Sequence, residues 1–186
     1  MFKKSDCKKK LQLVTRNIFE SILYHAVKDR NVVTAPRRIV FVCTGNICRS
    51  AFAEKMMKAG TMDTDVIVES CGLSVEVSSP SPEEAIRAAE KIGLDLKGHV
   101  SKGMEYCNLE NADLILAMEY RQYRKLVDYL PHKKPQIKLL REFVPFPENL
   151  LCNINDPFGR SQRNFEKCFA QIHLALPAIK FLISTS

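Results

Sequence analysis

The segment best suited to chemistry is Cys43-Thr44-Gly45-Asn46-Ile47-Cys48-Arg49-Ser50, which places a thiol and a guanidinium six positions apart. It follows the apolar run 39–42 and precedes a helical pattern, so we predict a strand-to-helix turn here. The backbone N–H groups of such a turn converge on an anion, and the helix dipole adds partial positive charge. The same field would hold Cys43 as a thiolate, the form that attacks an electrophile. The turn is therefore predicted to bind phosphate and to carry a nucleophile.

The context of this segment matters more than its spacing, since a Cys with an Arg six positions later arises by chance roughly 0.4 times in such a chain. Only Cys43 has an Arg at that offset, and only here do strand, loop and helix fall in register. Gly45 would let the backbone approach a ligand, Asn46 tolerates a left-handed conformation, and Ser50 can cap the following helix. The alternative is a buried structural cysteine after a core strand.

Strand and helix patterns alternate along the chain. We expect strands over 39–42, 66–69, 113–118 and 136–140, and helices over 51–59, 82–92, 119–129 and about 165–183. Ser81 is the expected N-cap of the second of these helices, with Glu84 completing a capping box. Pro177 is expected to bend or interrupt the last one. The alternation implies an α/β fold with one open parallel sheet, helices on both faces, and a ligand beyond the carboxyl ends of the strands.

The chain resembles the low-molecular-weight protein tyrosine phosphatases, in a bacterial-type form with an N-terminal extension. Residues 42–50 are similar to the signature loop of that family, although the family usually has Pro where this chain has Ala51. The segments 112–118 and Asp156-Pro157-Phe158-Gly159 also match, in the right order. The resemblance implies a four-stranded sheet in the order 2-1-3-4 with the phosphate loop after strand 1. It also divides the chain into an extension, 1–36, and a catalytic domain, 37–186.

The mechanism follows from what a phosphate monoester needs. Arg49 offers a planar fork of donors for two phosphate oxygens. Cys43 would attack phosphorus to give a cysteinyl-phosphate, and Ser50 is placed to donate a hydrogen bond to its sulfur. The resemblance implies that Asp156 is the general acid, and later the base that activates water. The other expected phosphate ligands are the loop residues Thr44, Gly45, Asn46, Ile47, Cys48 and Ser50.

The expected substrate is a phosphotyrosine-containing protein, which the resemblance suggests could be a tyrosine kinase. By position in the family, the walls of the slot for the tyrosine ring are Ile47, Leu73 and Phe158. Protein arginine phosphatases share the fold, but resemble a version with Thr in place of Ile47, so the apolar side chain favours an aryl ester. A protein-arginine phosphatase is the first alternative. A non-catalytic phosphate-binding module is the second, although such a module would normally lack the nucleophile, the arginine or the acid.

The cysteines suggest a reducing compartment, because their number is odd, seven, and their spacing irregular. We therefore expect a cytoplasmic protein with no metal and no other cofactor, since no zinc-binding pattern is present. Cys48 lies five residues after Cys43. It could form a reversible disulfide that protects the nucleophile, or it could simply fill a small buried space.

The first 36 residues carry eight Lys or Arg against three acidic residues, a net charge of +5, whereas the rest carries only +2. The basic balance thus belongs to the extension, and nucleic-acid binding is not expected. An amphipathic pattern predicts one helix through Asp29, with an apolar face formed by Leu11, Val14, Ile18, Ile22 and Val27. We expect this face to pack on the domain or on a second copy. Contact with an anionic membrane surface and a mobile tail are the other interpretations.

Overall fold

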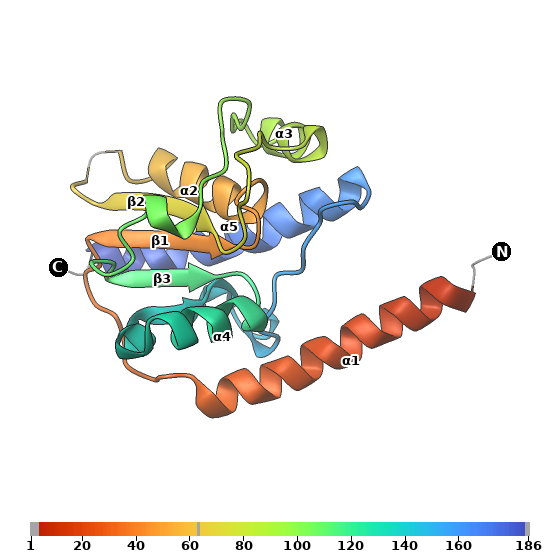
Figure 1. Ribbon diagram of the computed structural model, residues 1–186, viewed down its shortest axis with the longest axis horizontal. Helices are drawn as coiled ribbons and strands as arrows, with labels where there is room; N and C mark the ends of the chain where they lie inside the picture. The colour runs from red at the N-terminus through yellow and green to blue at the C-terminus, as the bar shows by residue number, and fades with distance from the viewer. Residues whose placement is uncertain (1–3, 63, 185–186) are drawn as a thin grey trace.

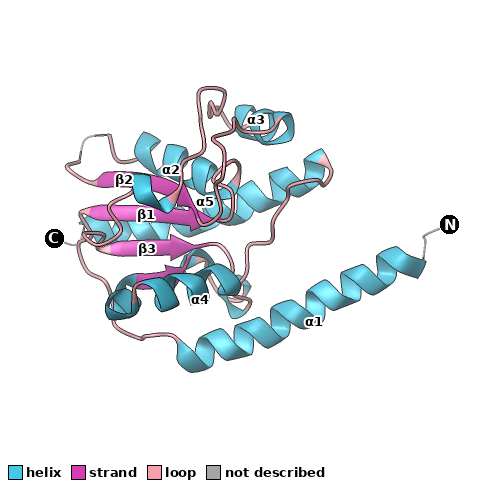
Figure 2. Ribbon diagram, viewed as in Figure 1, coloured by secondary structure: helices cyan, strands magenta, loops and turns pink. Residues whose placement is uncertain are grey.

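The computed structural model describes residues 4–62 and 64–184, which fold around a single four-stranded sheet (Figures 1 and 2). The strands pair in parallel in the order β2-β1-β3-β4. The open parallel sheet and its 2-1-3-4 order are therefore confirmed. The strands are β1 (Arg38–Cys43), β2 (Ile67–Gly72), β3 (Leu114–Ala117) and β4 (Ile137–Leu139).

Helices cover both faces of the sheet, as predicted (Figure 1). The helices α2 and α5 lie on one face and α3 packs against α5, whereas α4 lies on the other face with α1 beyond it. The helices are α1 (Lys4–Val27), α2 (Arg49–Ala59), α3 (Glu83–Glu90), α4 (Tyr120–Tyr129) and α5 (Gln162–Ser184). Short 3₁₀ turns, among them 140–143 after β4, complete the connections.

Strand β1 runs through the centre of the core and ends at the predicted nucleophile. Ile39 and Phe41 are buried in the cluster shared with α2 and α5, while Val40 and Val42 are buried in the cluster on the α4 side. Since both faces of the strand are covered, an unbroken apolar run is required rather than an alternating one. This packing fixes Cys43 at the carboxyl edge of the sheet.

The predicted N-cap of the helix over 82–92 is wrong. Helix α3 begins at Glu83, and Pro82 rather than Ser81 takes the N-cap position, because the extended Pro82 carbonyl accepts the first helical hydrogen bonds. The Ser81 hydroxyl is buried and has no partner among the described residues, so no capping box forms there.

Helix α5 is not interrupted at Pro177, and the other predicted effect of this proline, a bend, stays a prediction. Burial of its apolar face on both sides of the proline, at Ile172 and Ile179, stabilises the helix through this position.

Helix α1 exists and packs on the domain, but by a different face from the one predicted. Leu11, Ile18 and Ile22 of the apolar face are 63%, 48% and 63% exposed. Among the described side chains of α1, the buried ones are Asn17, Glu20, Ser21 and Tyr24. Their polar groups bind the domain; for instance, the Tyr24 hydroxyl donates to Glu142 and accepts a hydrogen bond from the Leu139 amide. These hydrogen bonds act together with the packing of the Tyr24 ring on the core cluster at the α4 side of the sheet.

In the part of the chain that the structure describes, every helix is too short or too polar to cross a membrane.

Candidate active site

The loop between β1 and α2 is shaped by Asn46, which adopts the left-handed conformation predicted for it, with φ of 53°. Its side-chain amide donates to the hydroxyls of Ser50 (2.9 Å) and Ser70 (2.8 Å), and its side-chain oxygen accepts from the Lys102 amide (3.0 Å). His99 Nε2 donates to its carbonyl at 2.6 Å. Asn46 is fully buried, so these contacts hold the loop against β2, through Ser70, and against the start of α2, through Ser50.

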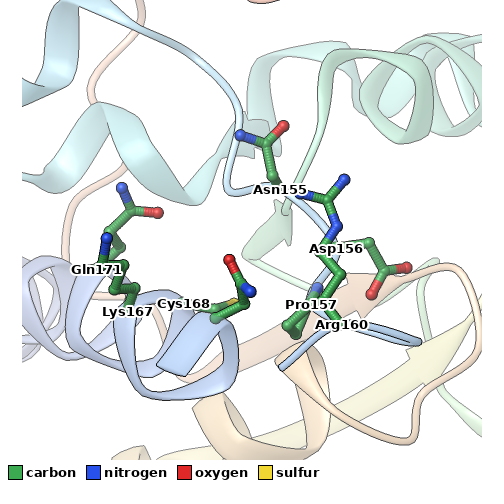
Figure 3. Close-up of a pocket in the computed structure, with 8 residues that line it drawn as sticks. Asn155, Asp156, Pro157, Arg160, Lys167, Cys168 and Gln171 are labelled. Atoms are coloured by element: carbon green, nitrogen blue, oxygen red, sulfur yellow. The ribbon is translucent and has the colours of Figure 1, made fainter. Parts of the chain in front are cut away.

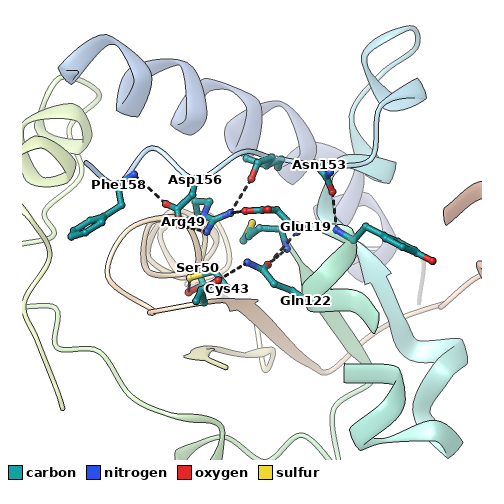
Figure 4. A network of polar contacts seen from close by, with 12 residues as sticks. Cys43, Arg49, Ser50, Glu119, Gln122, Asn153, Asp156 and Phe158 are labelled. Atoms are coloured by element: carbon teal, nitrogen blue, oxygen red, sulfur yellow. Dashed lines mark hydrogen bonds and ion pairs between the residues drawn. The ribbon is translucent and has the colours of Figure 1, made fainter. Parts of the chain in front are cut away.

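Cys43 Sγ lies at the centre of this loop and is almost fully buried. It is 3.0 Å from Ser50 Oγ and accepts the Asn46 backbone N–H at 3.2 Å (Figure 4). Ser50 is not the helix cap, because α2 begins at Arg49 and Cys48 occupies the N-cap position without a side-chain bond. The Ser50 hydroxyl accepts from Asn46, and its own proton can go to the Cys43 sulfur at 3.0 Å or to the more distant Cys71 carbonyl at 3.4 Å.

Replacing Ser50 with alanine should therefore lower turnover while phosphate still binds. A hydrogen bond to a charged group contributes about 1.5–3 kcal/mol, so we expect kcat to fall about 10- to 100-fold. The inhibition constant of inorganic phosphate should change less than about threefold, because the loop amides and Arg49 remain. Steady-state hydrolysis of para-nitrophenyl phosphate with phosphate as competitor measures both. An unchanged kcat would remove Ser50 from the mechanism.

The Arg49 side chain, 1% exposed, lies beneath the mouth of the loop. One terminal nitrogen donates to Glu119 and to the Ile154 carbonyl (3.0 Å), and the other donates to Asp156 (2.6 Å; Figure 4). Burial alone lowers the pKa of this guanidinium, but the nearby Cys43, Asp156 and Glu119 together raise it above its ordinary value. Arg49 is therefore a fixed cation held by two carboxylates.

Arg49 Nε is a buried donor with no hydrogen-bond partner among the described residues. Leaving such a group unpaired costs about 1–3 kcal/mol. Buried donors are almost always satisfied by protein, water or ligand, and an anion in the loop would supply an acceptor to this one.

Asp156 lies above the loop, in the segment that leads into α5 (Figure 4). Its side chain is 45% exposed, with one oxygen on Arg49 and the other accepting from the Phe158 amide at 3.1 Å. Pro157 follows and is buried, which restricts the backbone around the carboxylate. The structure thus brings Cys43, Arg49 and Asp156 together from opposite ends of the chain.

A pocket of about 210 Å³ opens over the loop, and two of the three predicted wall residues lie in it. Its lining is Cys43, Thr44, Gly45, Ile47, Cys48, Arg49, Asp156 and Phe158. Leu73 is not part of this wall: its amide donates to the Cys43 carbonyl at 2.9 Å, and its side chain packs against the core cluster on the α4 side of the sheet. A polar pocket of about 170 Å³, with Arg160, Lys167 and Cys168 in its lining, flanks the Asp156 segment (Figure 3).

Comparison with known proteins gives a consistent result. The model of the low molecular weight phosphotyrosine protein phosphatase family matches residues 38–182. The chain belongs to this family. The low molecular weight protein-tyrosine-phosphatase Wzb of Escherichia coli K12 is 32% identical over 127 residues, which are 68% of this chain and 82% of that protein.

Two solved structures of the family have the same fold. The tyrosine phosphatase AmsI of Erwinia amylovora superposes with a TM-score of 0.70 at 25% identity, covering 84% of this chain and 97% of that one. The YwlE arginine phosphatase of Geobacillus stearothermophilus gives a TM-score of 0.71 at 25% identity, covering 81% of this chain and 94% of its own. The fold alone therefore does not distinguish a tyrosine phosphatase from an arginine phosphatase.

Glu119 is part of this phosphatase site and was not predicted from the sequence. Glu119 follows β3, binds Arg49, and is the N-cap of α4 in a capping box with Gln122. Gln122 in turn donates to the Thr44 hydroxyl at 3.1 Å. The position of Glu119 in the sequence could have predicted its role, because an acidic residue directly after a buried parallel strand lies at the ligand-binding edge of the sheet.

Gly72, at the end of β2, was missed as well. A Cβ atom there would lie 2.8 Å from the Thr44 carbonyl oxygen and 3.1 Å from the Asn46 amide nitrogen. Any side chain would therefore push the phosphate loop away from the sheet. Gly45, by contrast, has ordinary room for a Cβ, whose nearest neighbour would be Ile47 at 3.8 Å.

Cys48 is buried in the same loop. Burial raises the pKa of its thiol, and the charges of Asp156 and Cys43 raise it further. A thiol that stays protonated exchanges slowly with other sulfurs. Its protective role therefore stays a prediction, and the pKa shift works against a fast disulfide.

Among the described residues, no group of three His, Cys, Asp or Glu side chains is placed to hold a metal ion.

Proposed function

We propose that this chain is a protein-tyrosine phosphatase that hydrolyses phosphotyrosine through a cysteinyl-phosphate intermediate. The observation that carries the proposal is that Cys43, Arg49 and Asp156 line one pocket, while the Nε of Arg49 is a buried donor without a partner among the described residues. A nucleophile, an anion clamp and a proton carrier are what phosphate monoester hydrolysis requires. The relatives named as tyrosine phosphatases support the same substrate class.

Substrate binding uses donors that are already in place. The phosphoryl oxygens would accept from the loop amides of residues 44–49 and from Arg49 Nε, while the aryl ring lies between Ile47 and Phe158. A phosphate dianion competes with Asp156 for the guanidinium of Arg49. This competition frees the Asp156 carboxyl to face the leaving oxygen.

The first chemical step transfers the phosphoryl group to Cys43. The thiolate attacks phosphorus, the P–O bond to the tyrosine breaks, and protonated Asp156 gives its proton to the phenolic oxygen. In the second step the Asp156 carboxylate takes a proton from water, and the water oxygen attacks phosphorus. Cys43 then leaves as a thiolate, stabilised by Ser50 and the Asn46 amide.

Replacing Asp156 with alanine should slow both steps. We expect kcat/KM for phosphotyrosine to fall about 10²- to 10³-fold, with a smaller loss for para-nitrophenyl phosphate, whose leaving group needs less help from an acid. Stopped-flow release of para-nitrophenol should show a burst, because the second step lacks its base. Equal losses for good and poor leaving groups, with no burst, would count against Asp156 as the acid.

The arginine phosphatase alternative rests on the structural likeness to YwlE. We favour the tyrosine ester because Ile47 presents a branched apolar side chain to the pocket, where a guanidinium phosphoramidate would gain little. Peptides carrying phosphotyrosine or phosphoarginine, hydrolysed side by side, test this directly. We expect wild type to prefer phosphotyrosine, and Ile47→Thr to shift the ratio toward phosphoarginine by about tenfold, about 1.4 kcal/mol. A wild-type preference for phosphoarginine would establish the alternative.

A tyrosine kinase as the partner and a cytoplasmic location stay predictions from the resemblance. The non-catalytic module is disfavoured because the nucleophile, the arginine and the carboxylate all lie at one pocket. Chelator should leave hydrolysis unchanged, since the loop and Arg49 supply the positive charge.

A further inference from the structure

Helix α1 lies outside the region that the family model matches, 38–182, and yet its buried face reaches the back of the active site. Its N-terminal part extends away from the body of the molecule, whereas its C-terminal part lies along α4 (Figure 1). Two separate sets of contacts from α1 lead to Arg49 and to the segment that carries Asp156.

The first set runs through Arg16. Its guanidinium lies 3.6 Å from one oxygen of Glu119, and the other oxygen of Glu119 accepts from Arg49. Arg16 also pairs with Glu20 at 3.8 Å, one turn along the helix. The Glu119 side chain is 13% exposed and that of Arg16 is 32% exposed, so this pair is partly screened by water and salt.

Arg16 changes the charge that a phosphate meets. Arg49 faces the carboxylates of Glu119 and Asp156 and the Cys43 sulfur. Arg16 places one additional positive charge beside Glu119, so that Glu119 draws less on the Arg49 guanidinium. A phosphate dianion is therefore bound more favourably.

The second set runs through Asn153, which is fully buried. Its amide nitrogen donates to Asn17 Oδ1 at 2.9 Å and to Glu20 at 2.5 Å, both on α1. Its side-chain oxygen accepts the first amide of α4, from Tyr120, at 2.7 Å (Figure 4). The carbonyl of the next residue, Ile154, accepts a hydrogen bond from Arg49, and Asp156 lies two positions further along the chain.

Ser21 of α1 reinforces this anchor, because its hydroxyl accepts the backbone N–H of Cys152 at 2.9 Å. The general-acid segment is thus fixed on α1 at two consecutive residues, 152 and 153. Both bonds are buried, where a lost partner costs more than at the surface.

We propose that α1 is a positioning element of this active site, in which Arg16 holds Glu119 behind Arg49 while Asn17 and Glu20 hold the segment that carries Asp156. The inference rests on the proposed function, since it assigns these residues an effect on phosphate binding and on leaving-group protonation. The two contact sets predict two different kinetic defects.

Arg16→Gln removes the charge and keeps much of the side-chain length. We expect KM for para-nitrophenyl phosphate and the inhibition constant of inorganic phosphate to rise about three- to fivefold, with a smaller change in kcat. The defect should shrink in high salt, because it is electrostatic. Arg16→Lys should recover most of it, since a single cation beside Glu119 is sufficient. A purely structural defect would show neither the salt dependence nor the recovery.

Asn17→Ala loosens the Asn153 anchor and leaves Arg16 in place. We expect kcat/KM for phenyl phosphate, a poor leaving group, to fall about three- to tenfold, and that for para-nitrophenyl phosphate to change less. Ile22→Ala, on the exposed face of α1, is the matched control and should behave as wild type. Thermal unfolding of every variant separates loss of the fold from loss of positioning.

The outcomes distinguish this inference from the proposed function. If wild type fails to hydrolyse aryl phosphates, the proposed function fails. If wild type is active but Arg16→Gln, Arg16→Lys and Asn17→Ala all match Ile22→Ala in KM, salt dependence and leaving-group preference, α1 is not a positioning element. Should Asn17→Ala prove unstable, Arg16→Gln and Arg16→Lys alone decide, because Arg16 is one-third exposed and both variants keep most of its side-chain length.

Discussion

Cys43→Ser is expected to lower kcat for para-nitrophenyl phosphate about 10⁴-fold or more, the largest effect of any single substitution in this chain. The serine hydroxyl stays protonated in the same field of loop amides, so it is a much weaker nucleophile than the thiolate. Inorganic phosphate should still bind with an inhibition constant within about fivefold of wild type, because its ligands are the loop amides and Arg49. Steady-state kinetics and isothermal titration with phosphate measure the two effects.

Cys168→Ala provides the control for this experiment, since it removes a different buried thiol whose sulfur has no role in the proposed chemistry. Burial raises the pKa of that thiol to about 12, so it remains protonated at neutral pH. Its replacement should leave kcat within about threefold of wild type. Substantial turnover by Cys43→Ser would mean that another group attacks phosphorus.

Arg49→Lys should lower kcat/KM about 10³- to 10⁴-fold, the second largest effect. The arginine holds Glu119, Asp156 and the Ile154 carbonyl at once and still keeps Nε free for phosphate. A lysine has one ammonium group and cannot make these contacts together. Removing one such transition-state donor typically lowers the rate 10²- to 10³-fold. Arg49→Lys loses two contacts to the phosphate, one from Nε and one from the terminal nitrogen for which phosphate competes with Asp156.

The matched control is Arg87→Lys, on the exposed surface of α3, which should leave both kinetic constants unchanged. For Arg49→Lys, phosphate affinity should fall together with turnover, unlike for Cys43→Ser. An Arg49→Lys enzyme with nearly normal kcat/KM would show that a point charge suffices and that the planar fork is not needed.

The sheet and the phosphate loop could be predicted from the sequence because their determinants are local. An unbroken apolar strand, the tolerance of Asn46 for positive φ and a helix starting beside Arg49 are all visible within about 20 residues. Asp156 lies more than 100 residues away, and only the family resemblance linked it to the loop. No periodicity could have paired its carboxylate with Arg49.

The remaining features depend on contacts between distant segments. Periodicity identified the apolar face of α1, but its buried face forms hydrogen bonds to Asn153 and Glu142 and packs Tyr24 on the core, and periodicity does not report contacts of this kind. The partnership of Glu119 with both Arg16 and Arg49 is long-range in the same way. Leu73 was assigned to the pocket by family position. In the structure its amide donates to the carbonyl of Cys43 at the end of β1, and its side chain packs against the core.

The most direct test of the central claim is to trap the phosphoenzyme. Asp156→Ala is mixed with para-nitrophenyl phosphate, quenched in acid within the burst, digested and analysed by mass spectrometry. We expect one phosphoryl group on the peptide that contains Cys43, and none after the additional Cys43→Ala substitution. Phosphate found on another residue, or no phosphoenzyme while the burst of nitrophenol is observed, would contradict it.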